Sequence, residues 1–457
     1  MVAVLAAGAT TGALVASRPT RAAHAAGRAA GSAPTTSPVP ASTSTIAPTT
    51  TTAPGTAALA ARLDGVVAGS NACVVVTDGP TPLYSHGAGT ALAPASTQKL
   101  LVAAAALALL GPDTRFTTTV VAPAAPVAGR VDGLWLVGGG DPMLASPEFI
   151  AYAATQPRVA AMSWTSLGSL ADALAAAGVR SVVGGVHADD SFLDQLRFLP
   201  AWPAHYHSDQ EIGPLSALSI NEGLQEWKPT TKLVTDPTAF AASELARLLT
   251  ARHVAAALAA VPTPPAAAPP SPAGAVTLAQ VTSPPVSQIV QFMLSASDNL
   301  IAELLVRQID KHAGGTGTTP GGVAAVLSEA TQLGVPTPGA VMLDGSGLAP
   351  GDRATCPELL AALQVGTRAG FEAITAGLPV AGHSGTLAGR YVTSPLAGKL
   401  RAKTGSIANV GGMVGTLDIT RPLSFAYLVN DTMNETQLFA KEDQLVQALA
   451  TYPETTP

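Results

Sequence analysis

A long run of alanine and leucine gives the clearest structural signal in this chain. Residues 96–110 read STQKLLVAAAALALL and are apolar on nearly every face, which predicts a buried helix. Pro94 and Ser96 mark its beginning, and a Gly-Pro pair ends it at 111 and 112. Ser96 therefore lies in a first helical turn, where backbone N–H groups are free. Lys99 follows three residues later on the same face.

Apolar strand patterns lie near both ends of the chain, and helical patterns flank them. The strand-like segments are 72–77, 83–86, 399–405, 410–419 and 423–430. The helical segments that flank them are 56–63 and 436–450. Both ends together predict one antiparallel sheet with helices on its faces, an α+β fold.

The region between these ends is far longer than the connection needs. It contains further strand-like segments at 134–137 and 181–186, bounded by turn residues. A Pro-rich stretch at 261–274 closes the region. We therefore expect a catalytic domain formed by residues 56–112 and 275–457, with residues 113–274 inserted as accessory structure.

Two further short motifs follow the Ser96–Lys99 pair along the chain. Ser297, Asp298 and Asn299 stand between two apolar helical stretches. Lys403, Thr404 and Gly405 end a strand-like segment, with Ser406 next. The chain has only seven lysines, so chance would supply about half of one S-x-x-K and about a tenth of one K-T-G.

An isolated S-x-x-K is most often a helix cap followed by a surface lysine. Here the lysine lies at the mouth of a buried helix, where desolvation lowers its pKa and a neutral amine can take a proton from serine. S-x-x-K, S-x-N and K-T-G together form the signature of penicillin-binding proteins and class A β-lactamases. The ordered trio therefore favours nucleophilic catalysis by Ser96 over the capping interpretation.

The composition excludes one broad class of function. Of the 457 residues, 47% are hydrophobic and 12% are charged, and the formal net charge is -6. This supports large apolar cores, and it gives no electrostatic reason to expect a nucleic-acid partner.

The N-terminal residues resemble an export signal followed by a spacer. Residues 2–16 are apolar and uncharged but too short and alanine-rich for a transmembrane helix, and 23–25 read as an A-x-A cleavage site. Residues 31–55 are almost entirely Ser, Thr, Pro and Ala, which predicts an extended stalk. We expect residues 1–30 to direct export to the cell envelope, with an N-terminal membrane anchor as one form of this. A tail with no targeting role is the alternative.

The cysteines and histidines leave two questions open. Cys73 and Cys356 are the only cysteines, and a disulfide and two buried free thiols are equally compatible with the pattern. His205 and His207 have no third ligand at a supporting spacing, so we expect a loop and no metal site. The motifs require no cofactor.

The ordered segments PASTQKL, GGGDPML, LSALSINEG, LDGSGLAP, LPVAGHSGTLAGR and RAKTGSIANVGG are similar to those of a known family. From residue 56 onward the chain resembles the low-molecular-mass class C penicillin-binding proteins, the serine-type D-alanyl-D-alanine carboxypeptidase/endopeptidases. The resemblance implies a penicilloyl-serine-transferase fold with structure spliced between the first two motifs. It also implies that peptidoglycan stem peptides are the substrate and that β-lactams acylate the enzyme.

The resemblance assigns a role to each motif residue. Ser96 would be the nucleophile and Lys99 its base. Ser297 would pass a proton toward the leaving amine, Asn299 would hold the substrate carbonyl, and Lys403 would orient Ser297 and supply positive potential. Thr404 and Ser406 would bind the terminal carboxylate, while backbone N–H groups of Ser96 and Ser406 would form the oxyanion hole. For Gly405, the physical expectation is that a side chain would block the substrate at the strand edge.

Two alternatives use the same residues. One is a β-lactamase, which the long insertion disfavours. The other is a wall-associated binding protein with a vestigial site, which the intact serines, lysines and Asn299 disfavour.

Overall fold

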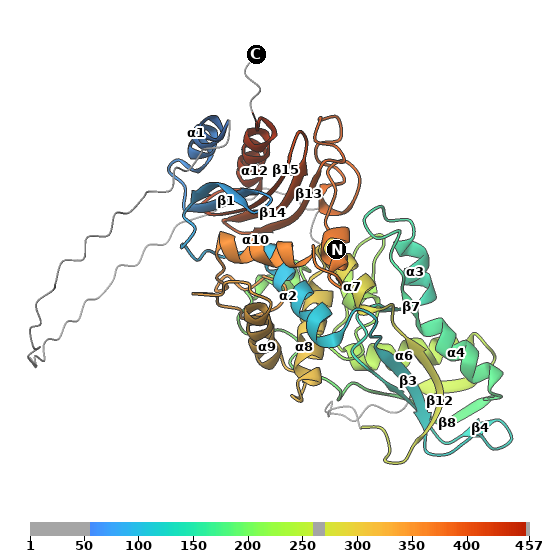
Figure 1. The fold of residues 1–457 in the computed structure, drawn as a ribbon. Coiled ribbons are helices and arrows are strands. Elements are labelled where there is room, and N and C mark those ends of the chain that lie inside the picture. The colour runs from blue at the N-terminus through green and yellow to red at the C-terminus, as the bar shows by residue number, and fades with distance from the viewer. Residues whose placement is uncertain (1–54, 259–269, 454–457) are drawn as a thin grey trace, which may run out of the picture.

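The computed structural model describes residues 55–258 and 270–453 (Figure 1). The expected export signal and nearly all of the spacer lie outside these residues. The predicted α+β architecture is confirmed. No helix within the described ranges is long and apolar enough to cross a membrane.

A five-stranded antiparallel sheet brings the two ends of the chain together. Its strand order is β13-β14-β15-β1-β2, and each neighbouring pair is antiparallel. The strands are β1 (Ala72–Asp78), β2 (Thr81–His86), β13 (Leu400–Ile407), β14 (Val410–Asp418) and β15 (Pro422–Asn430). β1 pairs with β15 along its whole length, from Ala72 opposite Val429 to Asp78 opposite Leu423. The strand patterns predicted at both ends of the chain therefore belong to one sheet.

Helices cover both faces of this sheet, because alternate residues of β1, an interior strand, are apolar on both sides. Val74 and Val76 face a core built with the outer helices α1 (Thr56–Val67) and α12 (Glu435–Ala450). Cys73 and Val75 face the opposite core, in the middle of Figure 1. That larger core contains apolar side chains from α2 (Lys99–Ala105), α7 (Val286–Ala296), α8 (Asn299–His312), α9 (Thr319–Gln332), α10 (Cys356–Val365) and α11 (Glu372–Ala376).

The predicted buried helix at 96–110 consists of three helical pieces. The 3-10 turn η1 (Ala95–Gln98) precedes α2, and the π-helical turn η2 (Ala106–Leu110) follows it. Every residue of α2 is buried, as the uniformly apolar sequence predicts.

The inserted region builds a second, mixed sheet at the lower right of Figure 1. Its order is β11-β8-β5-β3-β12, with β4 paired to β8. The strands are β3 (Thr117–Ala122), β4 (Arg130–Val131), β5 (Leu134–Val137), β8 (Ser181–Asp189), β11 (Ala255–Leu258) and β12 (Val276–Thr282). Helices α4 (Leu167–Ala176) and α6 (Pro237–Thr250) share its core.

One predicted boundary is wrong. We expected the catalytic domain to resume at residue 275, but β12 pairs antiparallel with β3 and completes the inserted sheet. The chain returns to the helical layer only at α7, which begins at Val286. The Pro-rich stretch therefore lies within the insertion and not at its end.

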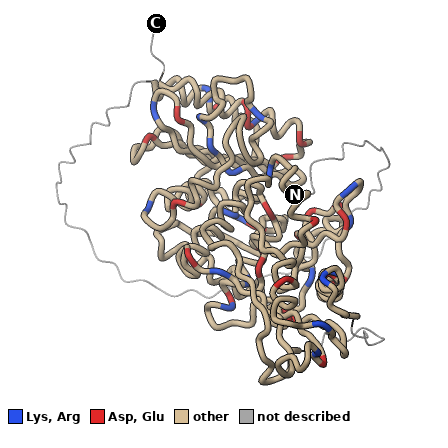
Figure 2. Tube along the Cα trace, turned by 90° about the vertical axis from the view of Figure 1, so that its right-hand side faces the viewer, with Lys and Arg blue, Asp and Glu red and all other residues tan. Residues whose placement is uncertain are grey.

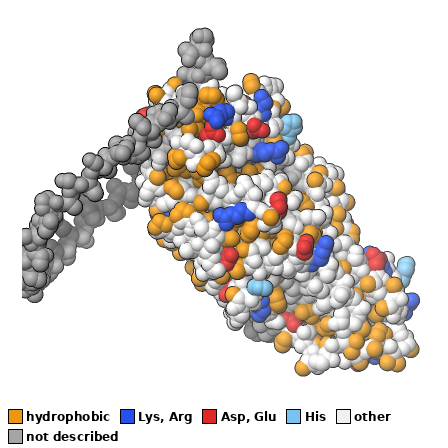
Figure 3. Space-filling model, in the orientation of Figure 1, with side chains coloured by type: hydrophobic (Ala, Val, Ile, Leu, Met, Phe, Trp, Pro, Cys, Tyr) orange, Lys and Arg blue, Asp and Glu red, His pale blue; other side chains and the backbone are white. Residues whose placement is uncertain are grey.

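The remaining elements are short. They are β6 (Leu144–Ala145), α3 (Pro147–Ala153), β7 (Thr165–Ser166), α5 (His205–Ser208), η3 (Asn221–Gly223), β9 (Leu224–Glu226), β10 (Lys232–Leu233) and η4 (Gly385–Leu387). Charged side chains are scattered along the described chain (Figure 2). On the face drawn in Figure 3, hydrophobic and neutral side chains predominate over the few charges.

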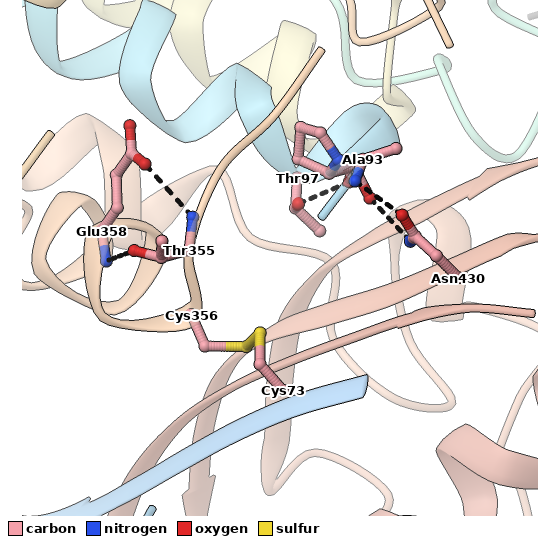
Figure 4. Close-up of a disulfide and its surroundings, with 8 residues drawn as sticks. Cys73, Ala93, Thr97, Thr355, Cys356, Glu358 and Asn430 are labelled. Atoms are coloured by element: carbon pink, nitrogen blue, oxygen red, sulfur yellow. Dashed lines mark hydrogen bonds between the residues drawn. A yellow bond between two sulfur atoms is a disulfide. The ribbon is translucent and has the colours of Figure 1, made fainter. Parts of the chain in front are cut away.

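Cys73 and Cys356 form a disulfide, which the sequence left open. Their Cα atoms are 6.0 Å apart, and the bond joins β1 to the first residue of α10 (Figure 4). Thr355 and Glu358 close a capping box at that helix end. The disulfide therefore ties β1, an interior strand of the sheet, to the helical layer that faces it.

Candidate active site

Ser96 and Lys99 lie on one helical segment with their side chains in contact. Ser96 belongs to η1, and Lys99 is the first residue of α2. Side chains three residues apart eclipse each other in a 3-10 turn, and Lys99 Nζ lies 2.8 Å from Ser96 Oγ. The sequence predicted a regular helix here, whereas the observed 3-10 turn aligns the two side chains directly.

The Lys99 side chain is fully buried, and each of its N–H groups has an acceptor. Besides Ser96 Oγ, the ammonium donates to Asn299 Oδ1 at 2.8 Å and to the Ser346 carbonyl at 2.6 Å. If the ammonium loses one proton, two donors remain for the amide and the carbonyl. The nitrogen lone pair then faces the Ser96 hydroxyl, which is the geometry a general base requires.

Burial lowers the pKa of Lys99 from 10.5 to about 8, because the charged form loses its hydration. Nearby carboxylates oppose this effect and favour the ammonium, in decreasing order Asp344, Asp298, Glu303 and Glu211. The balance leaves the lysine able to change its protonation state in the mildly alkaline range.

The second motif turns the chain sharply between two helices. Ser297 ends α7 with a left-handed backbone, φ 61° and ψ 36°. Asp298 then accepts the Ile301 N–H at 2.8 Å as the N-cap of α8, which is a structural role. Asn299 begins α8, and its Nδ2 donates to the Glu211 carbonyl at 2.8 Å. The turn directs Ser297 and Asn299 into the same cleft.

The third motif lies on β13, an edge strand of the five-stranded sheet. Lys403 Nζ donates to Ser297 Oγ at 2.8 Å and to the Thr404 carbonyl at 2.6 Å. Burial first, then the charges of Lys99 and Arg158, lower the pKa of Lys403 well below its ordinary value, while Glu442 opposes them. The two lysines thus connect all three motifs: Lys99 joins the first to the second, and Lys403 joins the second to the third.

The structure gives a different reason for a glycine at position 405 from the one that the sequence suggested. A Cβ at this position would lie 2.8 Å from the Pro94 carbonyl oxygen and 3.2 Å from the Ser96 nitrogen. The missing side chain therefore allows β13 to pack against the turn that carries Ser96, and it is not space left for a substrate. Thr404, one residue earlier, has its hydroxyl 2.8 Å from that of Thr386 on η4.

The cleft between these elements is a cavity of about 840 Å³. Its lining includes six of the predicted site residues, which are Ser96, Ser297, Asn299, Thr404, Gly405 and Ser406. Lys99 and Lys403 are fully buried and support the serines that line it. Gly385, Thr386 and Arg390 also line it.

The buried groups that support Lys99 could not be found from the sequence. The Ser346 carbonyl, in the turn at 344–347, accepts a hydrogen bond from Lys99 Nζ. Glu303 on α8 accepts the backbone N–H groups of Gly345 and Ser346 at 2.9 Å and 2.7 Å. Asp344 accepts those of Gly347 and Ala349. A backbone carbonyl has no residue-type signature, so the sequence offered no signal for this partner.

Asn430 is a second positioning residue that the sequence did not single out. Its side chain on β15 accepts the Ala93 N–H at 2.7 Å and donates to the Ala93 carbonyl at 3.1 Å (Figure 4). Ala93 lies three residues before Ser96, so these bonds hold the approach to η1 against the sheet.

His205 and His207 lie on the single-turn helix α5. No group of three or more His, Cys, Asp or Glu residues that could hold a metal ion occurs in the described part of the chain.

The motifs S-x-x-K, S-x-N and K-T-G meet in one cleft, beside a five-stranded antiparallel sheet flanked by helices. These features are those of a penicilloyl-serine transferase. The particular family follows from comparison with known proteins. The model of the D-Ala-D-Ala carboxypeptidase 3 (S13) family matches residues 56–267 and 230–452, and the chain belongs to this family. It is therefore a serine-type D-Ala-D-Ala carboxypeptidase.

Curated relatives agree with this assignment. The chain is 30% identical over 465 residues to the D-alanyl-D-alanine carboxypeptidase of Actinomadura sp. (strain R39). The aligned region covers 85% of this chain and 82% of the relative. It is 32% identical over 373 residues to carboxypeptidase DacB of Mycolicibacterium smegmatis, with 78% of this chain and 75% of the relative covered.

The fold has solved counterparts. Penicillin binding protein 4 from Haemophilus influenzae superimposes with a TM-score of 0.70, covering 87% of this chain and 99% of its own. At 20% identity, this likeness shows a common fold.

Proposed function

We propose that the enzyme cleaves the terminal D-Ala-D-Ala bond of peptidoglycan stem peptides, with Ser96 as nucleophile and Lys99 as its base. The observation that carries this assignment is the 2.8 Å contact between Lys99 Nζ and Ser96 Oγ at the floor of the cleft. The names of the relatives, which are D-alanyl-D-alanine carboxypeptidases, support the substrate class.

The proposed reaction runs in two halves. Neutral Lys99 takes the Ser96 proton as Oγ bonds to the substrate carbonyl carbon and forms a tetrahedral intermediate. The C–N bond then breaks, and a proton delivered through Ser297, whose hydroxyl contacts Lys403, leaves with the D-alanine amine. Water attacks the resulting acyl-serine, breaks its C–O bond and returns the proton to Ser96.

The other motif residues position the substrate in this proposal. The backbone N–H groups of Ser96 and Ser406 stabilise the oxyanion, an effect for which one donor typically contributes a factor of about 100 to 1,000 in rate. Thr404 and Ser406 bind the terminal carboxylate, and Asn299 binds the peptide carbonyl. The packing of Gly405 on η1 supports the oxyanion assignment, because it brings β13 close to the Ser96 backbone.

β-Lactams would acylate Ser96 and persist, because their leaving group stays attached after the ring opens. A solved structure of penicillin binding protein 4 from Haemophilus influenzae in complex with a β-lactam supports β-lactam binding by a protein of the same fold. Because stem peptides lie outside the cytoplasmic membrane, we propose that the enzyme is exported to the cell envelope by its N-terminal residues.

Penicillin labelling beside Ser96→Ala tests the assignment. A fluorescent penicillin should label the wild type, with the adduct mapped to Ser96 by peptide mass, and should not label Ser96→Ala. The wild type should also release D-alanine from a stem pentapeptide. Loss of D-alanine release, or an adduct on another residue, would contradict the proposal, and rapid penicillin turnover without a lasting adduct would indicate a β-lactamase.

A further inference from the structure

One arginine in the cleft has no role in the proposed reaction. Arg158 lines the active-site cavity, although it comes from the insertion, between α3 and β7. Arg390 lines the same cavity, and carboxylates neutralise it, Glu442 at 2.6 Å and Asp443 at 2.7 Å. Arg158 has no hydrogen bond or ion pair to any residue in the ranges that the structure describes. The two arginines therefore differ in that only Arg390 is already satisfied within the protein.

The segment that carries Arg158 is anchored beside the second motif. The backbone N–H groups of Val159 and Ala160 both donate to the Gln156 carbonyl, at 3.0 Å and 2.8 Å. Val159, 1% exposed, packs in the same apolar cluster as Ala296, the residue before Ser297. This packing places the half-buried Arg158 side chain at the cleft wall and not in bulk solvent.

Arg158 also differs from the two lysines beneath the cleft as a source of positive charge. Burial lowers the pKa of both lysines, and the Arg158 charge is one of the influences that lower that of Lys403. Burial lowers the pKa of Arg158 too, but a guanidinium begins so high that it keeps its proton at neutral pH. Arg158 is therefore the more constant cation at this wall.

The carboxylates that line the cavity leave this charge unpaired. Glu442 is engaged by Arg390, and neither Glu211 nor Glu435 forms an ion pair with Arg158. A guanidinium that is partly stripped of water and faces a cavity is suited to bind a carboxylate through two parallel hydrogen bonds.

We propose that Arg158 is a specificity-determining residue that binds a carboxylate of the stem peptide when the peptide occupies the cleft. The inference rests on the proposed function, because it takes the stem peptide as the substrate. Two carboxylates of such a peptide share this chemistry: the terminal one, and one carried by the residue before D-Ala-D-Ala. Either way, the insertion takes part in substrate selection.

A matched pair of substrates distinguishes the two sources. The peptides both end in D-Ala-D-Ala and differ only in whether the preceding residue carries a free carboxylate or its amide. D-Alanine release is measured for the wild type, Arg158→Gln, Arg158→Lys and the control Arg130→Gln, which changes an exposed arginine of the insertion outside the cavity. The rate of acylation by penicillin, whose carboxylate corresponds to the terminal one, is measured in parallel.

If Arg158 binds the upstream carboxylate, the wild type prefers the acid over the amide by about 10- to 100-fold in kcat/KM. Arg158→Gln brings that ratio close to one, while penicillin acylation is unchanged. If Arg158 binds the terminal carboxylate, Arg158→Gln raises KM for both peptides and slows penicillin acylation by a similar factor, and Arg158→Lys recovers part of each.

The acid-to-amide ratio and KM do not depend on how much of a variant is folded, so partial misfolding does not obscure the result. If Arg158→Gln matches Arg130→Gln in the ratio, in KM and in penicillin acylation, the inference is overturned while the proposed function stands. If the wild type itself releases no D-alanine from either peptide, the proposed function fails first.

Discussion

The two lysines of the cleft have the same burial and opposite electrostatic surroundings. Lys99 and Lys403 are both fully buried, and each donates to a motif serine at 2.8 Å. Four carboxylates act on Lys99 and favour its ammonium. Burial has the largest effect on the pKa of Lys403. Among charged groups, the cations Lys99 and Arg158 lower this pKa and Glu442 opposes them.

This difference assigns a separate task to each lysine. Desolvation alone would favour the neutral amine at both positions. The carboxylates hold the pKa of Lys99 at about 8, where a base can accept and return a proton. Burial and two cations lower the pKa of Lys403 well below its ordinary value, and its contact with Ser297 Oγ fits the orienting role that the resemblance implied.

The largest expected effect comes from removing the lysine that titrates. Lys99→Met should slow β-lactam acylation of Ser96 by about 1,000- to 10,000-fold, because among the described residues no other side chain is hydrogen-bonded to Oγ to take its proton. The acylation rate is followed by intact-protein mass. Lys399→Met, at an exposed lysine, is the control. An acylation rate of Lys99→Met within tenfold of the wild-type rate would show that Lys99 is not the base for Ser96.

Removing the other lysine should cost less and should leave the pH profile in place. Lys403→Met is expected to slow acylation by about 100-fold, because Ser297 loses its orienting contact. Burial and four nearby carboxylates are the main influences on the pKa of Lys99, so the acid limb of the rate profile should stay close to pH 8. A displaced limb would show that the two lysines titrate as a coupled pair.

A change in backbone packing tests whether β13 holds the nucleophile. Gly405→Ala should slow acylation by about tenfold, since the added Cβ would meet the Pro94 carbonyl and the Ser96 nitrogen and displace η1. Gly89→Ala, where a Cβ has open space, is the matched control. Equal acylation rates in the two variants would mean that the turn accommodates the methyl group without moving Ser96.

The smallest expected effect concerns the carboxylates under Lys99. Burial first, and Asp344 next, raise the pKa of Glu303 from 4.5 to about 8. The folded protein therefore binds a proton that the unfolded chain releases above pH 4.5, and this group makes stability fall as pH rises from about 4.5 to about 8. Glu303→Gln keeps an acceptor for Gly345 and Ser346 but cannot titrate.

Thermal melting of the two proteins at both ends of that pH range checks the sign. The decrease in Tm between about pH 5 and about pH 8 should be smaller in Glu303→Gln than in the wild type. Part of the decrease should remain, because burial raises the pKa of Asp352 and Glu222 as well. Identical decreases would mean that Glu303 is already ionised in the folded protein, which would strengthen its hold on Lys99.

The sequence predicted the parts of the site that have a residue-type signature. Ser96, Ser297 and Lys403 are far apart in the chain, and the structure brings them to one cleft. The Ser346 carbonyl could not be predicted, because any residue supplies one. The role of Gly405 was misjudged, because a sequence does not show which backbone lies opposite a missing Cβ.

The fold shows the same limit. The strands at both ends of the chain were predicted with small shifts in their bounds, because their apolar patterns are local. The boundary at 275 failed because β12 pairs with β3, more than 150 residues earlier, and that pairing leaves no local trace. The 3-10 turn η1 was missed because its four residues, ASTQ, are too few to show a helical period.

The pH dependence of Ser96 acylation by a β-lactam tests whether buried Lys99 takes the proton of Ser96. If buried Lys99 is the base, the wild-type rate rises with pH through an apparent pKa of about 8, and this rise is absent from Lys99→Met. A wild-type rate that stays flat from about pH 6 to about pH 9, with the adduct still on Ser96, would contradict the account.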